Sequence, residues 1–502
     1  MTFRVDDPVW TGSWLTRRAQ ATPEAEAVEF AGRVLSYAEL REETDSWVMK
    51  LRALGVEPGD RVAALLDNGL EWVRLLWAVQ EIGATLLPLN LRFVSQELVH
   101  VLRDSRARFL LHGPDEQAVR AEEAAALCPG LIRCAVADDP WGEPVTTPTR
   151  PEENATPIEA TSDLLAILYT SGTSGTPKGA LLSADAFWAS AVASAELLGT
   201  TAEDRWLVCM PLFHVGGLSI LIRACVAGSC AVIHPRFDAE QVAETLEQKR
   251  ISGVSFVATM LERVMAARGS SPSPPALRCV LLGGGPAPDA LLERASAQGY
   301  PIAPTYGLTE AASQVATRVP GGFEGPPSGG LVPLPGTELR IVDEEGGSLE
   351  PGSVGEICVR GPTLMRGYEG LPEATQQALR GGWLHTGDAG VLDESGRLRV
   401  LERRDDLIIS GGENIYPAEV ESVLESHPLI REAGVVGEVH GDLGARPVAW
   451  CVADGNERPA SSELEDFCRA RLAGYKVPDR FTWLDELPRT ASGKLLRRKL
   501  RG

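Results

Sequence analysis

Hydroxyl and glycine residues crowd around one lysine in the stretch YTSGTSGTPKG, residues 169–179. Successive glycine, serine and threonine residues let backbone N–H groups converge on one point, while hydroxyls and Lys178 add donors and a positive charge. Such a loop suits the oxygens of a phosphate group. It differs from the Walker pattern because Pro177 precedes the lysine and Gly179 follows it. The alternative is a flexible turn between two apolar strands.

Four further stretches contain glycine, and three of them combine it with polar or charged residues. They are GGGPAP at 283–288, YGLTE at 306–310, WLHTGD at 383–388 and LPRTASGKLLRRKL at 487–500. Taken singly, each has an ordinary explanation: a strand-to-helix turn, a strand end, a turn aspartate and a solvated basic tail. The order and spacing of the whole set are much more specific than any one member.

Together these stretches resemble the signatures of the adenylate-forming enzymes, which include acyl- and aryl-CoA synthetases, peptide-synthetase adenylation domains and luciferases. The resemblance extends over nearly the whole chain. It implies that a substrate carboxylate attacks the α-phosphate of ATP in the presence of Mg²⁺. The resulting acyl-adenylate is then expected to pass its acyl group to coenzyme A.

The resemblance also implies a role for each matched position. The residues of the phosphate loop are Thr170, Ser171, Gly172, Thr173, Ser174, Gly175 and Lys178. The residues that bind adenine and ribose are Gly284, Gly285, Pro286, Tyr306, Asp388 and Arg403. The catalytic residues are Lys494, Glu310, Thr309 and His214, and Glu310 also holds the metal. The hinge of the C-terminal domain is Asp405, and its loop on the coenzyme A side consists of Gly411, Gly412, Glu413 and Asn414.

One position departs from the family pattern. The family usually has glycine before the ribose-binding arginine, and here Glu402 stands in that place. A strand can carry glutamate there if the side chain faces solvent, so we expect activity to be retained.

The acid is indicated by CMPLFHVGGLSILIRA at 209–224, read with PTYGLTEAASQVAT and IISGGENIYPAEVE. These segments resemble the subfamily that joins o-succinylbenzoate, an aromatic dicarboxylate, to coenzyme A in menaquinone biosynthesis. Ser219, Arg223 and Ser313 are then candidates to contact the second carboxylate. The alternative for Arg223 is a solvated helix position, and the alternative for His214 is a structural role.

Two other functions stay open. One is a short- or medium-chain, or benzoate-type, acyl-CoA synthetase, because the signatures of these enzymes overlap heavily. The other is a non-catalytic protein that binds nucleotides or acyl-adenylates. A protein of that class is expected to lack Lys494, Glu310 or Lys178, and all three are present.

Short apolar strands alternate with amphipathic helices from about residue 60, as in the strand at 61–66, the helix at 69–83 and the strand at 84–89. This order predicts an α/β fold of mostly parallel sheets covered by helices. We expect an N-terminal domain at 1–404, made of two α/β subdomains and, from about residue 330, an antiparallel, β-barrel-like subdomain.

A small, mobile α+β domain is expected at 405–502. Its helices are predicted at 416–428 and 461–473, the second capped by its leading pair of serines. Its strands are predicted at 432–437 and 446–453. Under the family resemblance, this domain carries the catalytic lysine.

The amino-acid composition indicates which partners and which cellular environment to expect for this protein. The formal net charge of −21 argues against nucleic acid or an anionic membrane as a partner. The first residues lack the pattern of a secretory signal, and the nine cysteines show no CxxC spacing. We therefore expect a cytoplasmic protein with buried, reduced thiols that binds ATP, coenzyme A and a small carboxylic acid. Homodimerisation is a possibility raised only by the family resemblance.

Overall fold

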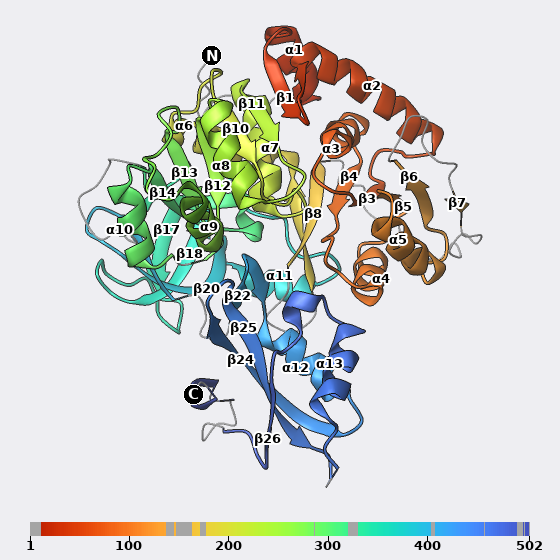
Figure 1. The fold of residues 1–502 in the computed structure, drawn as a ribbon, viewed down its shortest axis with the longest axis vertical. Coiled ribbons are helices and arrows are strands. Elements are labelled where there is room, and N and C mark those ends of the chain that lie inside the picture. Colours follow the sequence, from red (N-terminus) through yellow and green to blue (C-terminus); the bar gives the residue numbers. More distant parts are fainter. Residues whose placement is uncertain are drawn as a thin grey trace. The chain divides into compact units, whose positions relative to one another are not determined.

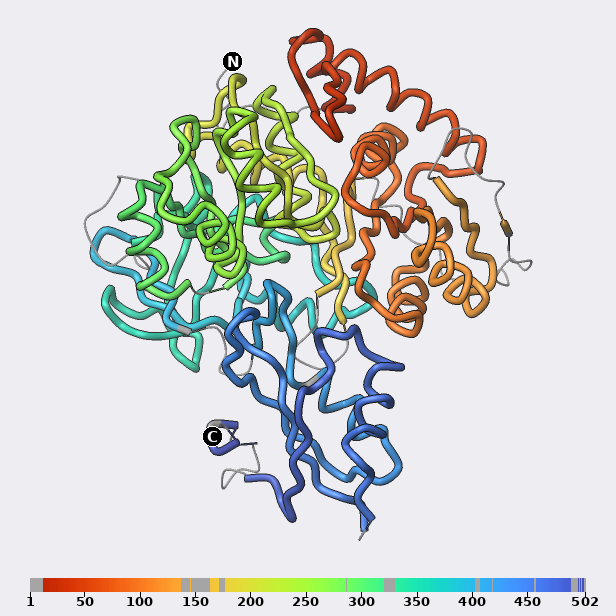
Figure 2. Tube along the Cα trace, viewed as in Figure 1, coloured from red at the N-terminus to blue at the C-terminus, as the bar shows by residue number. Residues whose placement is uncertain are grey.

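The computed structural model describes residues 12–136, 145–146, 163–170, 177–285, 287–319, 330–402, 407–455, 457–488, 495 and 497–500. The chain divides into two compact units. The first comprises 1–91, 102–168 and 179–401, and the second comprises 92–101, 169–178 and 402–502. Figures 1 and 2 follow the chain through both units, each of which is taken by itself below.

A seven-stranded sheet of the first unit has the order β7-β6-β5-β3-β4-β8-β9. Its strands are β3 (Arg61–Leu65), β4 (Thr85–Pro88), β5 (Phe109–His112), β6 (Ile132–Ala135), β7 (Val145–Thr146), β8 (Leu164–Thr170) and β9 (Lys178–Ser183). The helices of the first unit associated with it are α3 (Leu70–Ile82) and α5 (Glu116–Ala126), whereas most of α4 (Ser95–Asp104) belongs to the second unit. The pairs β3–β4, β3–β5, β4–β8 and β5–β6 are parallel, and β3 to β5 are fully buried, as continuous apolar runs predict.

A nine-stranded sheet has the order β16-β15-β14-β13-β12-β10-β11-β1-β2. Its strands are β1 (Glu26–Phe30), β2 (Arg33–Ser36), β10 (Arg205–Val208), β11 (Cys230–Ile233), β12 (Gly253–Phe256), β13 (Cys279–Leu282), β14 (Ile302–Leu308), β15 (Ser313–Thr317) and β16 (Val332–Pro333). Its helices are α1 (Trp14–Ala21), α2 (Tyr37–Ala53), α6 (Ala184–Leu198), α7 (Val215–Ala227), α8 (Ala239–Gln248), α9 (Ala258–Arg268) and α10 (Asp289–Ala297). Pairing is parallel from β1 through β14 and antiparallel from β14 to β16.

Helices cover both faces of the nine-stranded sheet. Successive residues of a strand point to opposite faces, so Leu207 joins the core under α8, α9 and α10 while Trp206 and Val208 join the core with α6 and α7. Figure 1 shows α8 to α10 gathered beside β12 and β13. Helix α7 is apolar around most of its circumference, and all its residues from Gly217 onward are buried. This central position matters because α7 carries two of the predicted acid-contacting residues.

An antiparallel five-stranded sheet completes the first unit. It has the order β17-β18-β20-β19, with β21 paired to β20. Its elements are β17 (Glu338–Val342), β18 (Gly355–Arg360), α11 (Pro372–Ala378), β19 (Leu379–Arg380), β20 (Trp383–Leu392) and β21 (Leu398–Glu402). The β17–β18, β18–β20 and β19–β20 pairs are antiparallel, as expected for the chain after about residue 330, but antiparallel pairing already begins with β14 and β15; the barrel-like subdomain stays a prediction.

The second unit contains the C-terminal α+β fold. Its elements are β22 (Ile408–Ser410), β23 (Glu413–Ile415), α12 (Pro417–Glu425), β24 (Ile430–His440), β25 (Gly444–Ala453), α13 (Ser461–Arg469), β26 (Phe481–Leu484) and the 3-10 turns η2 (Gly474–Lys476) and η3 (Arg497–Lys499). The long hairpin of β24 and β25 packs with α12 and α13 around one core. The predicted serine cap of α13 is wrong, since Ala460 is the N-cap residue and the two serines lie inside the first turn.

The predicted burial of the cysteines is confirmed, because all nine are free and buried. Among the described residues, no helix has both the length and the apolar character needed to cross a bilayer. The described chain is thus an α/β structure with an antiparallel sheet and a smaller α+β unit, as the sequence predicts.

A buried ion pair joins two distant segments of the first unit. Arg61, at the start of β3, contacts Glu369 through both of its Nη atoms at 3.0 and 2.9 Å, and each side chain is only 7% exposed. The Glu369 N–H also donates to the carbonyl of Gly179 in β9. The pair therefore connects the seven-stranded sheet to the segment that precedes α11.

We predict that Glu369→Ala lowers the free energy of unfolding by about 3–5 kcal/mol, because it leaves the Arg61 charge buried and unpaired. Urea unfolding followed by circular dichroism measures the change. The double variant Arg61→Met/Glu369→Leu removes both charges and should recover most of the loss. Equal destabilisation by the single and double variants would contradict this explanation.

Candidate nucleotide and acid site

Two of the predicted adenine- and ribose-binding residues, Tyr306 and Asp388, are in contact within the first unit. Tyr306 lies near the end of β14 and is 5% exposed, and Asp388 lies in β20. The Tyr306 hydroxyl donates to Asp388 Oδ2 at 2.7 Å. A bond over 82 positions of sequence thus brings an aromatic face and a carboxylate to one place, the combination that a nucleoside needs for stacking and for hydroxyl recognition.

A glycine turn follows β13, next to β14 in the parallel part of the sheet. Parallel neighbours end at the same edge, where open α/β sheets bind their ligands. Gly284 has φ +80°, and a Cβ there would lie 2.7 Å from Val257 Cγ1. Only glycine fits this position without strain, and the turn runs close to Thr305 of β14, since a Cβ on Gly283 would lie 2.9 Å from Thr305 Cγ2. Gly285 follows it.

Thr309 and Glu310 stand directly after β14, in the 3-10 turn η1 (Thr309–Ala311). The Glu310 side chain is held by Tyr368, whose hydroxyl donates to Glu310 Oε1 at 2.9 Å. Its backbone is held as well, because Met365 N–H donates to the Glu310 carbonyl at 2.8 Å. A carboxylate with hard oxygen donors, fixed by two contacts, fits the preference of Mg²⁺.

The candidate acid-contacting residues make two side-chain contacts between α7 and β15. Ser219 and Arg223 are four residues apart on α7 and so share one face. Ser219 Oγ and Ser313 Oγ lie 3.3 Å apart, and Arg223 Nη1 donates to Gln314 Oε1 at 3.1 Å. Ser313 has φ +115°, a strained conformation for a non-glycine residue that costs about 1–3 kcal/mol and is typical of functional sites.

Arg223 is a buried cation. Its side chain lies over the Trp206 ring, with Cζ 4.8 Å from the ring centroid, and the residue is 4% exposed. Burial lowers the pKa of Arg223 to about 10, which still leaves it charged at neutral pH. Among the residues that the structure describes, its Nη2 atom has no hydrogen-bond partner. The predicted alternative of a solvated helix position for Arg223 is therefore wrong.

His214 is the N-cap residue of α7, and its ring lies 4.6 Å from that of Phe213. Its side chain makes no capping hydrogen bond with the helix. Since α7 also carries Ser219 and Arg223, one helix and its N-cap hold the predicted catalytic histidine and two of the three predicted acid contacts.

Several predicted site residues lie outside the described residues. They are Ser171, Gly172, Thr173, Ser174, Gly175, Pro286, Arg403, Asp405 and Lys494. Thr170 ends β8 and Lys178 begins β9, so the described chain delimits the predicted phosphate loop on both sides. In the second unit, Gly411 and Gly412 form the turn between β22 and β23, while Glu413 and Asn414 begin β23.

Sequence reasoning did not select Tyr368 or Trp206 as site residues, and it noted Gln314 only as part of the Ser-Gln pair that follows the YGLTE motif. Gln314 Oε1 accepts from Ser194 Oγ at 2.5 Å as well as from Arg223, and Gln314 Nε2 donates to Thr317 Oγ1 at 2.8 Å. The only sequence feature that points to Gln314 is its position four residues after the YGLTE motif. The contacts of Tyr368 and Trp206 depend on tertiary structure and leave no local pattern.

A strand-end glycine turn, an aromatic–carboxylate pair and a fixed Glu310 are features expected of an α/β enzyme that binds a nucleotide at the carboxyl edge of a parallel sheet. The family models agree: residues 15–369 match the AMP-binding enzyme model, and residues 419–494 match the AMP-binding enzyme C-terminal domain. The chain belongs to the AMP-binding enzyme family.

Similar proteins extend along the whole chain. A 2-succinylbenzoate–CoA ligase of Geobacillus kaustophilus is 43% identical over 492 residues, or 97% of each chain, and one from Bacillus thuringiensis is 40% identical over 97% of this chain and 98% of its own. The o-succinylbenzoate CoA synthetase of Bacillus subtilis, solved as a double mutant with a product analogue, has TM-score 0.85 at 38% identity, covering 98% of both chains.

Two other solved structures broaden the comparison. The Bacillus subtilis synthetase solved with ATP and magnesium ion has TM-score 0.70 at 38% identity, covering 97% of this chain and 99% of that chain. An amide bond synthetase from Marinactinospora thermotolerans has TM-score 0.85 at 29% identity with the same coverage. The fold therefore also serves an enzyme whose name denotes amide formation, so the choice of acid and acceptor has to be argued from this chain's own residues.

We predict that Tyr368→Phe lowers the rate of pyrophosphate release about tenfold, because a hydrogen bond to a carboxylate is worth roughly 1.5–3 kcal/mol and Glu310 loses its orientation. Tyr300→Phe is the matched control, since it removes a hydroxyl bonded to Arg268 at 2.8 Å in the same unit. A rate loss of the same size in both variants would contradict a specific role for Tyr368.

Proposed function

We propose that this protein is an ATP- and Mg²⁺-dependent acid–thiol ligase that forms AMP and pyrophosphate, and that its acid is o-succinylbenzoate. The observation that carries the choice of acid is Arg223, a buried guanidinium one helical turn from Ser219 and without a carboxylate partner among the described residues. The relatives over 97% of the chain that are named for this substrate support the proposal.

The reaction needs activation because a carboxylate is a poor electrophile. Joining it to AMP gives a mixed anhydride with a good leaving group. The difficulty is to bring one anion against the α-phosphate of another, so catalysis consists mainly of positioning and charge neutralisation. In the proposed mechanism, Tyr306 stacks on adenine, Asp388 accepts from the ribose hydroxyls and Thr309 donates to the α-phosphate.

Mg²⁺, held by Glu310, would neutralise phosphate charge in this site. Lys178 and the loop at 170–175 donate to the β- and γ-phosphates and release them as pyrophosphate. In the proposed mechanism, Lys494 would neutralise the carboxylate and the α-phosphate as they approach each other. Loss of one well-placed donor of this kind typically costs about a hundredfold to a thousandfold in rate.

The second half-reaction requires the coenzyme A thiol to reach the acyl carbon, where Lys494 stands in its way. We propose that the C-terminal domain rotates about Asp405 so that the loop at 411–414 replaces the lysine. His214 would then border the path of the thiol. Hinge residues of this type absorb a backbone change that lets one enzyme assemble two sites in turn.

Arg223 supplies the discrimination between acids. Burial of an uncompensated charge costs free energy, and the bound acid's second carboxylate returns part of that cost by pairing with the unpartnered Nη2 atom. A monocarboxylate leaves the guanidinium unpaired. Short- or medium-chain and benzoate-type acids are therefore the disfavoured alternatives, and a non-catalytic binding protein is the alternative of another class. Location in the cytoplasm and a homodimeric state remain predictions.

The direct test supplies Mg-ATP, coenzyme A and one acid at a time from o-succinylbenzoate, benzoate, malonate and hexanoate. We predict a kcat/KM for o-succinylbenzoate at least about a hundredfold above the others, or roughly 2.7 kcal/mol of discrimination. Thioester mass and pyrophosphate are measured together. Comparable values for benzoate or hexanoate would assign the protein to the alternative enzymes, and no pyrophosphate with any acid would favour the binding protein.

We predict that Arg223→Met lowers kcat/KM for o-succinylbenzoate about a hundredfold and leaves that for benzoate nearly unchanged. The melting temperature should stay the same or rise, because an unpaired buried charge is removed. Arg223→Lys is the comparison, since it keeps the charge but loses the planar fork. Equal losses on both acids would show that Arg223 does not read the second carboxylate.

We predict that Lys494→Ala nearly abolishes adenylate formation and spares thioester formation from supplied acyl-adenylate. Asp405→Pro should have the reverse effect, because proline restricts φ at the hinge. Single-turnover assays of each half-reaction separate the two. If each variant slowed both halves equally, the proposed division of labour would be wrong.

A further inference from the structure

The strand that carries Asp388 is interrupted where Asp388 stands. In the antiparallel pair of β18 and β20, Cys358 lies opposite His385 and Glu356 lies opposite Ala389. Two steps along β18, from 356 to 358, therefore match four steps along β20, from 385 to 389. The two extra residues make a β-bulge, a device that re-aims a side chain and often lies beside active sites. Asp388 is inside this bulge.

A bulge releases backbone groups from the ladder, and they need other partners. The Gly387 N–H donates to Glu356 Oε1 at 2.9 Å. The Asp388 N–H donates to Thr386 Oγ1 at 3.1 Å, and Thr386 Oγ1 donates to the Ile357 carbonyl at 2.8 Å. Gly387 has φ +72°, which favours glycine at this step of the bulge.

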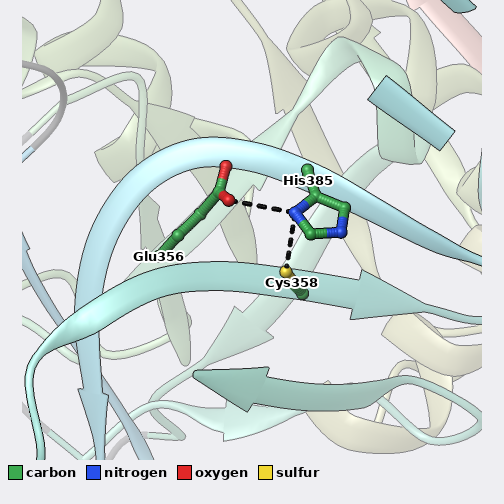
Figure 3. A group of neighbouring side chains, drawn as sticks. All are labelled: Glu356, Cys358 and His385. Carbon is green, nitrogen blue, oxygen red and sulfur yellow. Dashed lines mark hydrogen bonds and ion pairs between the residues drawn. The ribbon is translucent and has the colours of Figure 1, made fainter. Parts of the chain in front are cut away.

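Glu356 also holds the residue at the start of the bulge. His385 Nδ1 lies 2.9 Å from Glu356 Oε2 and 3.3 Å from Cys358 Sγ, as Figure 3 shows. An ionised carboxylate can only accept, so Nδ1–H donates to Glu356. One carboxylate thus accepts from His385 with one oxygen and from Gly387 with the other. It closes the bulge on both sides of Thr386.

Glutamate, cysteine and histidine are also ligand types for a transition metal, and these three ligand atoms lie within 4.8 Å of one another. Three features favour the hydrogen-bonded cluster instead. Both oxygens of Glu356 already accept hydrogen bonds. Arg380 Nη2 lies 3.5 Å from Glu356 Oε2, so this carboxylate already has a cationic neighbour. Burial raises the pKa of the Cys358 thiol to about 11, away from the thiolate that binds metals.

We propose that Glu356 is a positioning residue for nucleotide binding: by closing the bulge through Gly387 and His385, it aims the Asp388 carboxylate at the ribose hydroxyls. The inference rests on the proposed ribose contact of Asp388. Tyr306 also helps to orient the Asp388 carboxylate, because its hydroxyl donates to Asp388 Oδ2. The bulge fixes the backbone position of Asp388, and Tyr306 fixes the orientation of its carboxylate. Loss of Glu356 therefore turns Asp388 away from the ribose but leaves its carboxylate present.

The test measures equilibrium binding with no acid and no coenzyme A, so that no turnover occurs. The ligands are Mg-ATP and 2′,3′-dideoxy-ATP, which lacks the hydroxyls that Asp388 would contact. The variants are Glu356→Ala, Glu356→Gln and Asp388→Ala. Glu338→Ala is the matched control, because it removes an exposed carboxylate from the neighbouring strand of the same sheet, where it pairs with Arg360.

We expect Glu356→Ala to weaken ATP binding about tenfold and to leave dideoxy-ATP binding unchanged, as expected for loss of one charge-assisted hydrogen bond. Asp388→Ala should give the same selective loss, and Glu338→Ala should change neither ligand. Glu356→Gln keeps an acceptor for the Gly387 N–H, so its ATP loss should be smaller but still selective. It supplies the same comparison if the alanine variant does not fold.

Equal weakening of both nucleotides by Glu356→Ala and Glu356→Gln would indicate a merely structural role and would overturn the proposal. If Asp388→Ala weakened both nucleotides equally, the ribose contact itself would be wrong. If Asp388→Ala were selective and the Glu356 variants were not, only the positioning role would fail. One equivalent of zinc retained by the purified protein and lost in Cys358→Ala would assign the cluster to a metal and would also overturn the proposal.

Discussion

Parallel pairing of β13 with β14 is the constraint on which the candidate site depends. Leu282, the last residue of β13, pairs with Pro304, so the glycine turn after β13 arrives beside the next residues of β14, Thr305 and Tyr306. Tyr306, Thr309 and Glu310 then follow one another along a single chain segment. The antiparallel sheet contributes Asp388 from β20, and the bond from Tyr306 to Asp388 joins the two sheets. Secondary structure places the groups, and side-chain contacts orient them.

Charge is the second constraint, because the proposed ligands are anions and the chain carries a formal charge of −21. Local placement resolves this conflict. Arg223 lies in the core between Trp206 and Gln314, where low polarity strengthens its attraction for an anion and surface charge has little influence. Burial of this charge lowers the stability of the folded protein, and in our proposal the buried charge is what recognises the second carboxylate of the substrate.

Much of this structure could be predicted because its signals are local. Apolar runs followed by helical periodicity located the parallel strands, and gapless motifs such as YGLTE identified Tyr306 and Glu310. The unpredicted features depend on distant partners. Tyr368 is 58 positions from Glu310, and the bulge at Asp388 is a matter of strand register, which no single segment encodes. The serine cap of α13 is wrong by one position, because Ala460 is the N-cap residue and the helix already begins at Ser461.

The central claim is that the acid is activated as an adenylate before coenzyme A takes part. The most direct measurement mixes the protein, at substrate concentration, with o-succinylbenzoate and Mg-ATP and omits coenzyme A. Mass spectrometry of the quenched mixture should show about one equivalent of o-succinylbenzoyl-AMP and of pyrophosphate per protein, and added coenzyme A should convert the adenylate to thioester. Absence of adenylate until coenzyme A is added, or formation of ADP and phosphate, would contradict the account.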